Sequence, residues 1–364
     1  MSWRATAALA RERTGELVVE EIELRDPRPG ELLVRIAGVG FCHSDLMFRR
    51  TGSPVPLPVV LGHEGAGVVE AVGPGVSAIA PGDHVVLSFD SCGGCESCGR
   101  AMPAYCARFR ELNAVGTPPD GSAAARDSAG GAVGTRWFGQ SSFASYAVAT
   151  ARNAVRVDRD LPLELLGPLG CGLLTGAGTV LNHLRVPVGS SVAVVGTGAV
   201  GMAAVMAAAA AGAERIVAVD LHPGRLELAA ELGATHCVLG DQLTPATGRE
   251  LLGRVDHAVD TSGAPQAILA ALAALGPGGR LALVGTGTGP VPIDPSTLAG
   301  RQVGFVVEGE AVPQTFIPEL LALWREGSFP FERLVTTYAL DDVARAEVDL
   351  TSGRTVKPVL VPAS

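Results

Sequence analysis

Hydrophobic positions change their spacing about halfway along the chain. Between residues 5 and 86 they alternate with polar positions in short runs, such as Leu32, Val34 and Ile36, which Gly and Pro interrupt. This alternation predicts β-strands with one buried face. From Ser191 onward, apolar runs of strand length alternate with helical stretches. That second pattern is typical of a doubly wound parallel sheet.

The chain is therefore expected to be a mixed α/β protein with two domains. We place the β-rich domain at residues 1–172, the parallel-sheet domain at 173–304, and a return to the first domain at 305–364, which ends in the apolar strand VKPVLVP. A length of 364 residues agrees, because a single core usually stops growing below it. Residues 114–136 are rich in Gly, Ala, Ser and Pro, and we expect a surface loop without chemistry there.

Composition narrows the classes of function. A formal net charge of -9 gives no basic surface for nucleic acid or anionic lipid. The most apolar run, Ala199 to Ala213, is shorter than the roughly 18 residues that a membrane-spanning helix needs, and the N-terminus lacks a signal-peptide core. Seven cysteines without a secretion signal favour a reducing compartment. We expect a cytoplasmic protein with no nucleic-acid or membrane partner. Lys357 is its single lysine.

Four cysteines lie close together in the sequence. Cys92, Cys95, Cys98 and Cys106 follow one another at intervals of three, three and eight residues. Zn²⁺ prefers a tetrahedral set of ligands, and four thiolates leave no position open for a substrate. The spacing predicts a structural zinc lobe at about residues 88–110. Two disulfides or four unrelated thiols are the alternatives.

A glycine-rich turn follows the apolar run SVAVV. Gly196, Gly198 and Gly201 form a G-x-G-x-x-G pattern, which allows a tight turn and close approach of the backbone to a pyrophosphate. Asp220 follows 19 residues after Gly201, where an acid would bond the adenosine ribose and favour NAD over NADP. Arg225 would weaken that preference or simply lie in solvent. A glycine turn with an Asp that caps a helix is the alternative for the whole pattern.

Three cysteines remain outside the four-cysteine lobe. Cys42 in GFCHSD and Cys171 in LGCGLLTG, with His63 in GHEG, would give zinc a Cys₂His set and one open position. Spacing alone does not decide between that site and three packed or surface side chains. Cys237, in the apolar run THCVL, is expected to be a core thiol.

These motifs occur in the order found in zinc-dependent medium-chain alcohol dehydrogenases, which the chain resembles over essentially its whole length. LSFDSCGGC, WFGQSSFASYA and LELLGPLGCG are similar to the aryl (benzyl) alcohol dehydrogenase branch, which includes geraniol dehydrogenases. The resemblance implies a GroES-like catalytic domain, a Rossmann domain, NAD, and two zinc ions per chain. It assigns the catalytic zinc to Cys42, His63 and Cys171.

The resemblance also assigns residues around the zinc and the cofactor. Asp45 would orient His63, and Glu64 would be a transient ligand or a neighbour of the zinc. A buried, satisfied carboxylate is the alternative for both acids. At the cofactor, the resemblance places Thr175 and Val200 beside the nicotinamide and Lys357 near the pyrophosphate.

The proton relay departs from the pattern of the family. Ser44 would take the first proton, but Met47 stands where the better-known relay ends in a histidine. His43 would then pass the proton on or bind the pyrophosphate. Met47, Trp137 and Phe138 are candidate linings of an apolar substrate pocket, with core packing as the alternative.

We therefore expect reversible oxidation of an aromatic or allylic primary alcohol to its aldehyde by hydride transfer to NAD. An aliphatic alcohol or a hydroxymethyl thiol adduct is the alternative substrate, and a dinucleotide-binding relative without redox activity is the alternative class. Similar enzymes pair their cofactor sheets edge to edge, so we expect a homodimer or homotetramer that uses the strand QVGFVV.

Overall fold

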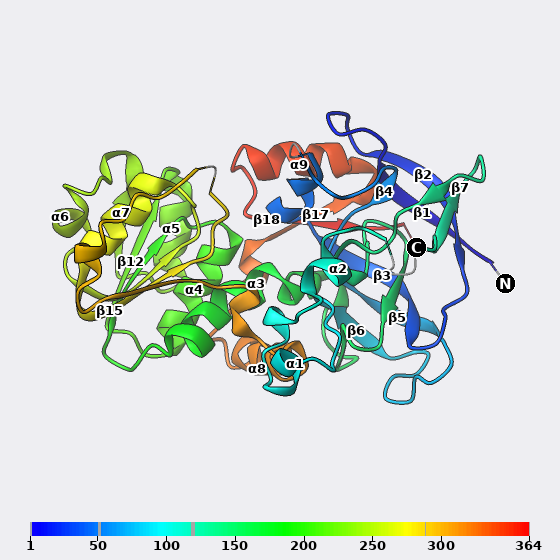
Figure 1. Ribbon diagram of the computed structural model, residues 1–364, viewed down its shortest axis with the longest axis horizontal. Helices are drawn as coiled ribbons and strands as arrows, with labels where there is room; N and C mark the ends of the chain where they lie inside the picture. The colour runs from blue at the N-terminus through cyan, green and yellow to red at the C-terminus, as the bar shows by residue number, and fades with distance from the viewer. Residues whose placement is uncertain (1, 50–51, 118–120, 288, 364) are drawn as a thin grey trace. The chain divides into compact units, whose positions relative to one another are not determined.

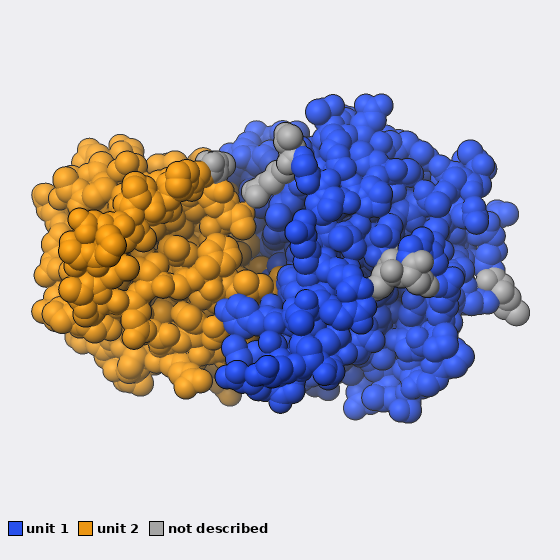
Figure 2. All heavy atoms as spheres, viewed as in Figure 1, with its two compact units in different colours: residues 1–171, 312–318, 334–364 blue, residues 172–311, 319–333 orange. Residues whose placement is uncertain are grey.

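The computed structural model describes residues 2–49, 52–117, 121–287 and 289–363. The chain divides into two compact units, which Figure 2 shows in blue and orange. The first comprises residues 1–171, 312–318 and 334–364, and the second comprises residues 172–311 and 319–333. We expected residues 305–364 to return to the first domain as a whole. Instead, 305–311 and 319–333 stay with the second unit, where Arg333 forms an ion pair with Glu231.

The described part of the first unit forms two sheets, both largely antiparallel (Figure 1). The smaller has the order β4-β1-β2-β7-β8, with strands at Val59–Val60, Ser2–Ala10, Val18–Arg25, Ala125–Asp127 and Ala132–Val133. The larger has the order β10-β6-β5-β3-β18-β17, with β9 beside β3. Its strands are Ala154–Val157, His84–Leu87, Glu64–Val72, Glu31–Gly40, Lys357–Val361, Val335–Ala339 and Tyr146–Thr150.

Burial along β3 alternates only around Arg35, because Leu33 is buried as well as its neighbours. Leu32, Val34 and Ile36 are buried, as the spacing of apolar residues predicts. Arg35 lies between them, is exposed, and forms an ion pair of 2.7 Å with Glu70 of β5. The helices of this unit are α1 (Glu96–Gly99), α2 (Phe109–Asn113) and α9 (Val343–Thr351).

The segment that we expected to be a loop without structure contains a hairpin. Strands β7 and β8 lie within residues 114–136, and β7 pairs with β2. Asp127 accepts hydrogen bonds from the amide of Gly131 (2.8 Å) and from Arg11 (3.1 Å), while Val133 is buried. These contacts fix the hairpin although its composition is typical of a loop. Residues 118–120 of the segment lie outside the described residues.

The second unit is built on a parallel sheet with the order β13-β12-β11-β14-β15-β16. The strands are His236–Leu239, Arg215–Asp220, Ser191–Val195, Val255–Asp260, Leu275–Leu283 and Gln302–Phe305. Its helices are α3 (Gly172–Gly178), α4 (Ala199–Ala210), α5 (Pro223–Glu231), α6 (Gly248–Leu252) and α7 (Pro265–Ala274). The strand order reverses at β11 and β14, the switch point at which such sheets bind ligands.

One expectation about the residues of this unit is wrong. Cys237 is exposed, because β13 is an edge strand and not part of the core as we expected. Helix α8 (Pro313–Arg325) begins in the first unit and ends in the second. Thr288 lies outside the described residues. Among the helices that the structure describes, none is long and apolar enough to cross a membrane.

Candidate functional site

The four close cysteines converge around the short helix α1. The sulfurs of Cys92, Cys95, Cys98 and Cys106 lie within 4.8 Å of one another. Backbone amides point at them, since Cys92 N lies 3.3 Å from Cys106 Sγ and Ala107 N lies 3.5 Å from Cys95 Sγ. None of the seven cysteines, all of which lie among the described residues, forms a disulfide, so the disulfide alternative is wrong. Four converging sulfurs that accept hydrogen bonds from backbone N–H groups fit a closed tetrathiolate metal site.

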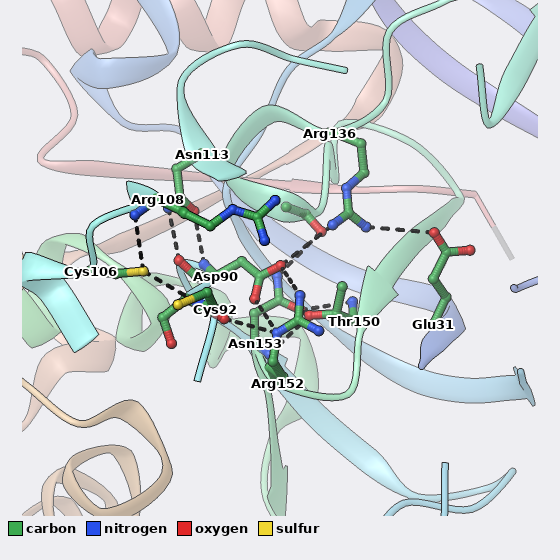
Figure 3. Close-up of polar contacts among 12 residues, drawn as sticks. Glu31, Asp90, Cys92, Cys106, Arg108, Asn113, Arg136, Thr150, Arg152 and Asn153 are labelled. Carbon is green, nitrogen blue, oxygen red and sulfur yellow. Dashed lines mark hydrogen bonds and ion pairs between the residues drawn. The ribbon is translucent and has the colours of Figure 1, made fainter. Parts of the chain in front are cut away.

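Asp90 anchors this lobe (Figure 3). Its buried carboxylate lies 2.9 Å from Arg152 Nη2 and 3.4 Å from Arg136 Nη2. Its backbone N–H donates to the Asn113 side-chain oxygen (2.8 Å), and the Asn113 amide donates back to the Asp90 carbonyl (2.9 Å). Asn113 ends α2, so these bonds join the entry and exit of the lobe. The sequence analysis singled out neither residue.

A second group of ligands gathers Cys42, His63, Glu64 and Cys171. One ligand atom from each lies within 4.8 Å of the others. Cys42 follows β3, His63 lies between β4 and β5, and Cys171 follows a 3-10 turn at Gly167–Gly170. Gly62 has φ +81, and a Cβ there would overlap with Phe143. A glycine is thus required immediately before the histidine.

His63 is oriented with one ring nitrogen available. Its Nδ1 lies 2.6 Å from Asp45 Oδ1, and its Nε2 is buried without a partner among the described residues. Burial by itself lowers the pKa of His63, but the charges of Asp45 and Cys42 raise that pKa well above its usual value. A hydrogen bond with Cys171 and the nearby cations hold the pKa of Cys42 well below its usual value. Two thiols and an imidazole nitrogen that has no partner among the described residues fit a zinc site. Binding of the ion would displace the protons that remain on these ligands.

Glu64 faces Lys357 across this group. The Lys357 ammonium lies 3.0 and 2.9 Å from the two carboxylate oxygens of Glu64 and 3.3 Å from the Phe41 carbonyl. Both side chains are buried. Burial raises the pKa of Glu64, and the Lys357 charge opposes that rise. Lys357 was expected at the pyrophosphate, and its contact in this unit is with Glu64.

The residues that follow Cys42 form a 3-10 helix at His43–Arg49. His43 is exposed, while Ser44 and Met47 are half-buried. Met47 packs against the apolar core of the first unit, which agrees with the core-packing alternative. Its place in a pocket stays a prediction, as do the roles of His43 and Ser44 in proton transfer.

Two aromatic residues contact the histidine and its acid. Trp137 is 2% exposed and donates its indole N–H to Asp45 Oδ1 at 2.9 Å. Phe138 stacks on the His63 ring, with centroids 4.3 Å apart and planes at 25°. Phe138 has a left-handed backbone with φ +48, an uncommon conformation for a bulky side chain. The sequence placed both residues near the site but gave no sign of these contacts.

The glycine-rich turn joins β11 to α4. Gly196 has φ +89, and a Cβ on Gly201 would overlap with the Gly196 carbonyl oxygen. Gly198 precedes the helix, and a Cβ there would meet nothing within 4 Å. Asp220 ends β12, and its Oδ2 accepts from Thr197 N (2.7 Å) and Thr197 Oγ1 (2.9 Å). The acid is thereby tied to the turn itself.

Arg225 lies beside this acid rather than free in solvent. Its Nη1 is 3.8 Å from Asp220 Oδ2, and its side chain is 16% exposed. The Asp220 Oδ1 atom accepts from the His222 amide (2.9 Å), so the acid also orders the start of α5. The bonds of Asp220 to Thr197 and His222 are local ones, as the structural alternative expects, and the cofactor roles of Asp220 and Arg225 stay predictions.

Helix α3 lies against the first turn of α4. A Cβ on Gly176 would overlap with the Val200 carbonyl oxygen, so the two helices touch where Thr175 and Val200 lie. The Thr175 hydroxyl donates to Glu308 Oε2 at 3.3 Å. Glu308 has φ +48. No motif in the sequence points to Glu308.

Comparisons with known proteins indicate dehydrogenases along most of the chain. Residues 28–159 match the family described as alcohol dehydrogenase GroES-like domain, and residues 199–322 match the family described as zinc-binding dehydrogenase. A geraniol dehydrogenase of Castellaniella defragrans is 45% identical over 98% of this chain and 97% of its own length. An S-(hydroxymethyl)glutathione dehydrogenase of Escherichia coli is 34% identical over 99% of this chain and 100% of its own length.

Solved structures give the same result. An alcohol dehydrogenase zinc-binding domain protein from Burkholderia ambifaria has a TM-score of 0.97 at 48% identity and covers 100% of both chains. A benzyl alcohol dehydrogenase from Acinetobacter calcoaceticus has a TM-score of 0.94 at 41% identity and covers 99% of this chain and 100% of its own. The expected fold, a GroES-like domain with a Rossmann-like parallel sheet, is confirmed.

Proposed function

The chain belongs to the zinc-dependent medium-chain alcohol dehydrogenase family, and from that premise we propose that it oxidises aromatic or allylic primary alcohols to aldehydes with NAD. The observation that carries the proposal is the convergence of Cys42, Cys171 and the Nε2 of His63, for which the described part of the chain offers no hydrogen-bond partner. A Cys₂His set leaves one position open, which is the arrangement of an alcohol-activating zinc site.

Two zinc ions per chain are proposed. Cys42, His63 and Cys171 would hold the catalytic ion, which as a Lewis acid lowers the pKa of an alcohol hydroxyl. The four-cysteine lobe would hold the second ion, in a purely structural role. Asp45 orients His63. The ion pair with Lys357 occupies both oxygens of Glu64, so Glu64 would act as a neighbour of the catalytic zinc that becomes a ligand only when this pair breaks.

Proton removal is assigned to residues of the 3-10 helix after Cys42. Ser44, two residues after the ligand, would accept the proton of the alcohol. Met47 has no group that holds a proton, so the relay cannot end there. His43 is exposed and would bind the cofactor pyrophosphate, with proton transfer as the second possibility. An unchanged pH profile of kcat in His43→Gln would support the binding role alone.

The dinucleotide would lie at the switch point of the second unit. Gly198 leaves the approach to the N-terminus of α4 open, which suits a pyrophosphate. Asp220 is buried at the end of β12, where a carboxylate accepts from ribose hydroxyls and repels the phosphate of NADP. Arg225 partly offsets that charge. Thr175 and Val200 would lie beside the nicotinamide, and Lys357 would reach the pyrophosphate only by giving up part of its contact with Glu64.

An aromatic or allylic substrate is supported by two observations. The ring of Phe138 lies against His63, so a flat apolar face borders the metal site. The adjacent Trp137 ring meets Phe138 with centroids 5.1 Å apart, and Met47 packs against the same apolar core. Two of the relatives are named for geraniol and benzyl alcohol. A conjugated aldehyde product also makes the oxidation of such alcohols more favourable.

Steady-state kinetics tests this proposal. Benzyl alcohol, geraniol, ethanol and S-(hydroxymethyl)glutathione would be compared, each with NAD and with NADP. We expect the highest kcat/KM for benzyl alcohol or geraniol with NAD. Highest kcat/KM for the glutathione adduct would favour the second candidate, which the relative from Escherichia coli supports. No turnover, with zinc bound only at the four-cysteine lobe, would leave a relative without redox activity.

We also propose that the chain forms a homodimer, or a homotetramer built from such dimers, through the edge strand β16. This strand ends the sheet of the second unit, and Phe305 on it is 51% exposed. An uncovered edge strand with an apolar side chain favours pairing with a second copy. Light scattering of the parent protein and of Phe305→Lys checks this, because the variant should lose the dimer.

A further inference from the structure

The carboxylate of Asp45 collects more donors than an orienting contact to one histidine requires. Its Oδ1 accepts from His63 Nδ1 (2.6 Å), from the Gly62 amide (3.1 Å) and from Trp137 Nε1 (2.9 Å). Its Oδ2 accepts from the Cys42 amide at 3.1 Å. The side chain is fully buried. One carboxylate therefore holds the backbone of one proposed ligand and the ring of another, and an indole from a distant segment holds the carboxylate.

The indole adds orientation without adding charge. An indole N–H donates only and does not change its protonation state near neutral pH. Its hold on the Asp45 carboxylate therefore does not depend on a proton of its own. The two rings of this segment also bracket His63. Phe138 stacks on it, and Trp137 meets it edge-on, with centroids 6.4 Å apart and planes at 87°.

Trp137 is itself firmly placed. Its backbone N–H donates to Ser141 Oγ (2.9 Å), which donates to the Val60 carbonyl (2.6 Å). The preceding residue, Arg136, is buried and reaches the Asp90 carboxylate (Figure 3). Gln140 of the same segment donates to the His63 carbonyl at 2.9 Å. The segment 136–141 is thus held at both ends by contacts that do not involve the bond between the Trp137 indole and Asp45.

We infer that Trp137 is a positioning residue of the proposed catalytic metal site, because its indole N–H locks Asp45 in the rotamer that points His63 Nε2 at the ion. This inference rests on the proposed metal centre. It differs from the pocket lining and core packing expected from the sequence, since either of those roles needs only an apolar ring. Partners that orient a metal-bound histidine commonly change metal affinity by about 10- to 100-fold when removed.

Trp137→Phe removes the indole N–H and keeps an aromatic ring. The chain offers a matched control in Trp324→Phe, because Trp324 Nε1 donates to Glu332 Oε2 at 2.7 Å in the second unit. Both variants lose the same kind of indole–carboxylate bond. Zinc-loaded parent and variants would be mixed with a chromogenic zinc chelator, and release would be followed without substrate or cofactor. A Cys171→Ser variant identifies which phase of release belongs to the Cys42, His63 and Cys171 site.

We expect Trp137→Phe to release the zinc of that site about 10-fold faster or more, with the four-cysteine zinc and Trp324→Phe unchanged. Equal release in all three proteins would overturn the inference, and so would acceleration of both phases, which indicates general loosening. A parent that binds zinc only in the four-cysteine lobe would overturn the metal centre itself, and the zinc content reveals that result separately.

A second substitution guards against a misfolded Phe variant. Benzothienylalanine, incorporated at position 137, keeps the bicyclic shape of indole and replaces its N–H by sulfur. It should release zinc as fast as Trp137→Phe does. Parent-like release with benzothienylalanine would show that shape alone matters and would overturn the role of the N–H. The visible spectrum of Co²⁺ bound in place of zinc gives an independent readout, because its bands should shift only in the two variants at position 137.

Discussion

Replacing Asp90 by Asn should loosen the first unit more than the loss of any surface ion pair does. The Asp90 carboxylate is fully buried and faces Arg136, whose side chain is 6% exposed, and Arg152, whose side chain is 46% exposed. Burial already lowers the pKa of Arg136, which shows that its charge is poorly solvated. Without the carboxylate, the ion pair that the described residues still offer Arg136 is the one with Glu31, at 4.0 Å.

The size of the free-energy loss depends on which guanidinium stays buried after the substitution. Removing one partner of a buried ion pair costs about 3–5 kcal/mol, and we expect the lower end because the Asn oxygen still accepts a hydrogen bond. Arg152 regains water, so its share is about 0–1 kcal/mol. The expected loss is about 3 kcal/mol, which corresponds to a change of roughly 150-fold in an opening equilibrium.

Hydrogen exchange of the zinc-loaded protein measures this loss locally. A chain with two units and bound metal does not unfold in one step, so exchange in peptides covering β6 and β10 is more informative than a single melting curve. The matched control is Glu70→Gln, which breaks the exposed Arg35–Glu70 pair and should cost less than about 1 kcal/mol. Equal exchange in Asp90→Asn and Glu70→Gln would refute the reasoning.

Three further predictions concern the glycine turn, the acid and the zinc lobe. Gly201→Ala should lower the stability of the second unit by about 1–3 kcal/mol because its Cβ overlaps with the Gly196 carbonyl, whereas Gly198→Ala should melt normally but bind NAD about tenfold more weakly. Equal melting temperatures for Gly201→Ala and Gly198→Ala would contradict the expected loss of stability at Gly201. Asp220→Asn should reduce the ratio of kcat/KM for NAD to that for NADP by about tenfold, and an unchanged ratio would show that the acid does not select the cofactor. Cys98→Ser should lose the zinc of its lobe and melt earlier, with activity declining as a consequence. A fully stable but inactive variant would argue against a structural role.

The sequence, together with the family resemblance, indicates the sites whose chemistry depends on residue type and local order. Cys42, His63 and Cys171 are recognisable because few side chains bind zinc, and their motifs recur in a fixed order. The turn from Gly196 to Gly201 is recognisable because its requirement is local: a strand, a tight turn and a helix. In the structure, the side chains of the proposed zinc ligands lie together.

The contacts that support these sites depend on pairing between distant segments. Arg136 and Asp90 are 46 residues apart, and Trp137 and Asp45 are 92 residues apart. No periodicity links such pairs. The outcome for Cys237 has a similar cause, because its strand is apolar in sequence and its exposure follows from the strand order in the sheet. The hairpin at β7 and β8 depends on pairing with β2, which its short, Ala- and Gly-rich strands do not announce.

The burial of Lys357 makes the folded chain almost inert to reagents that attack primary amines. It is the single lysine of the chain, it is 2% exposed, and both oxygens of Glu64 hold its ammonium. Apart from the α-amino group, labels that acylate primary amines would find no target until the first unit opens around Glu64. The rate at which such reagents modify Lys357 would thus report how often the first unit opens locally around its proposed catalytic site.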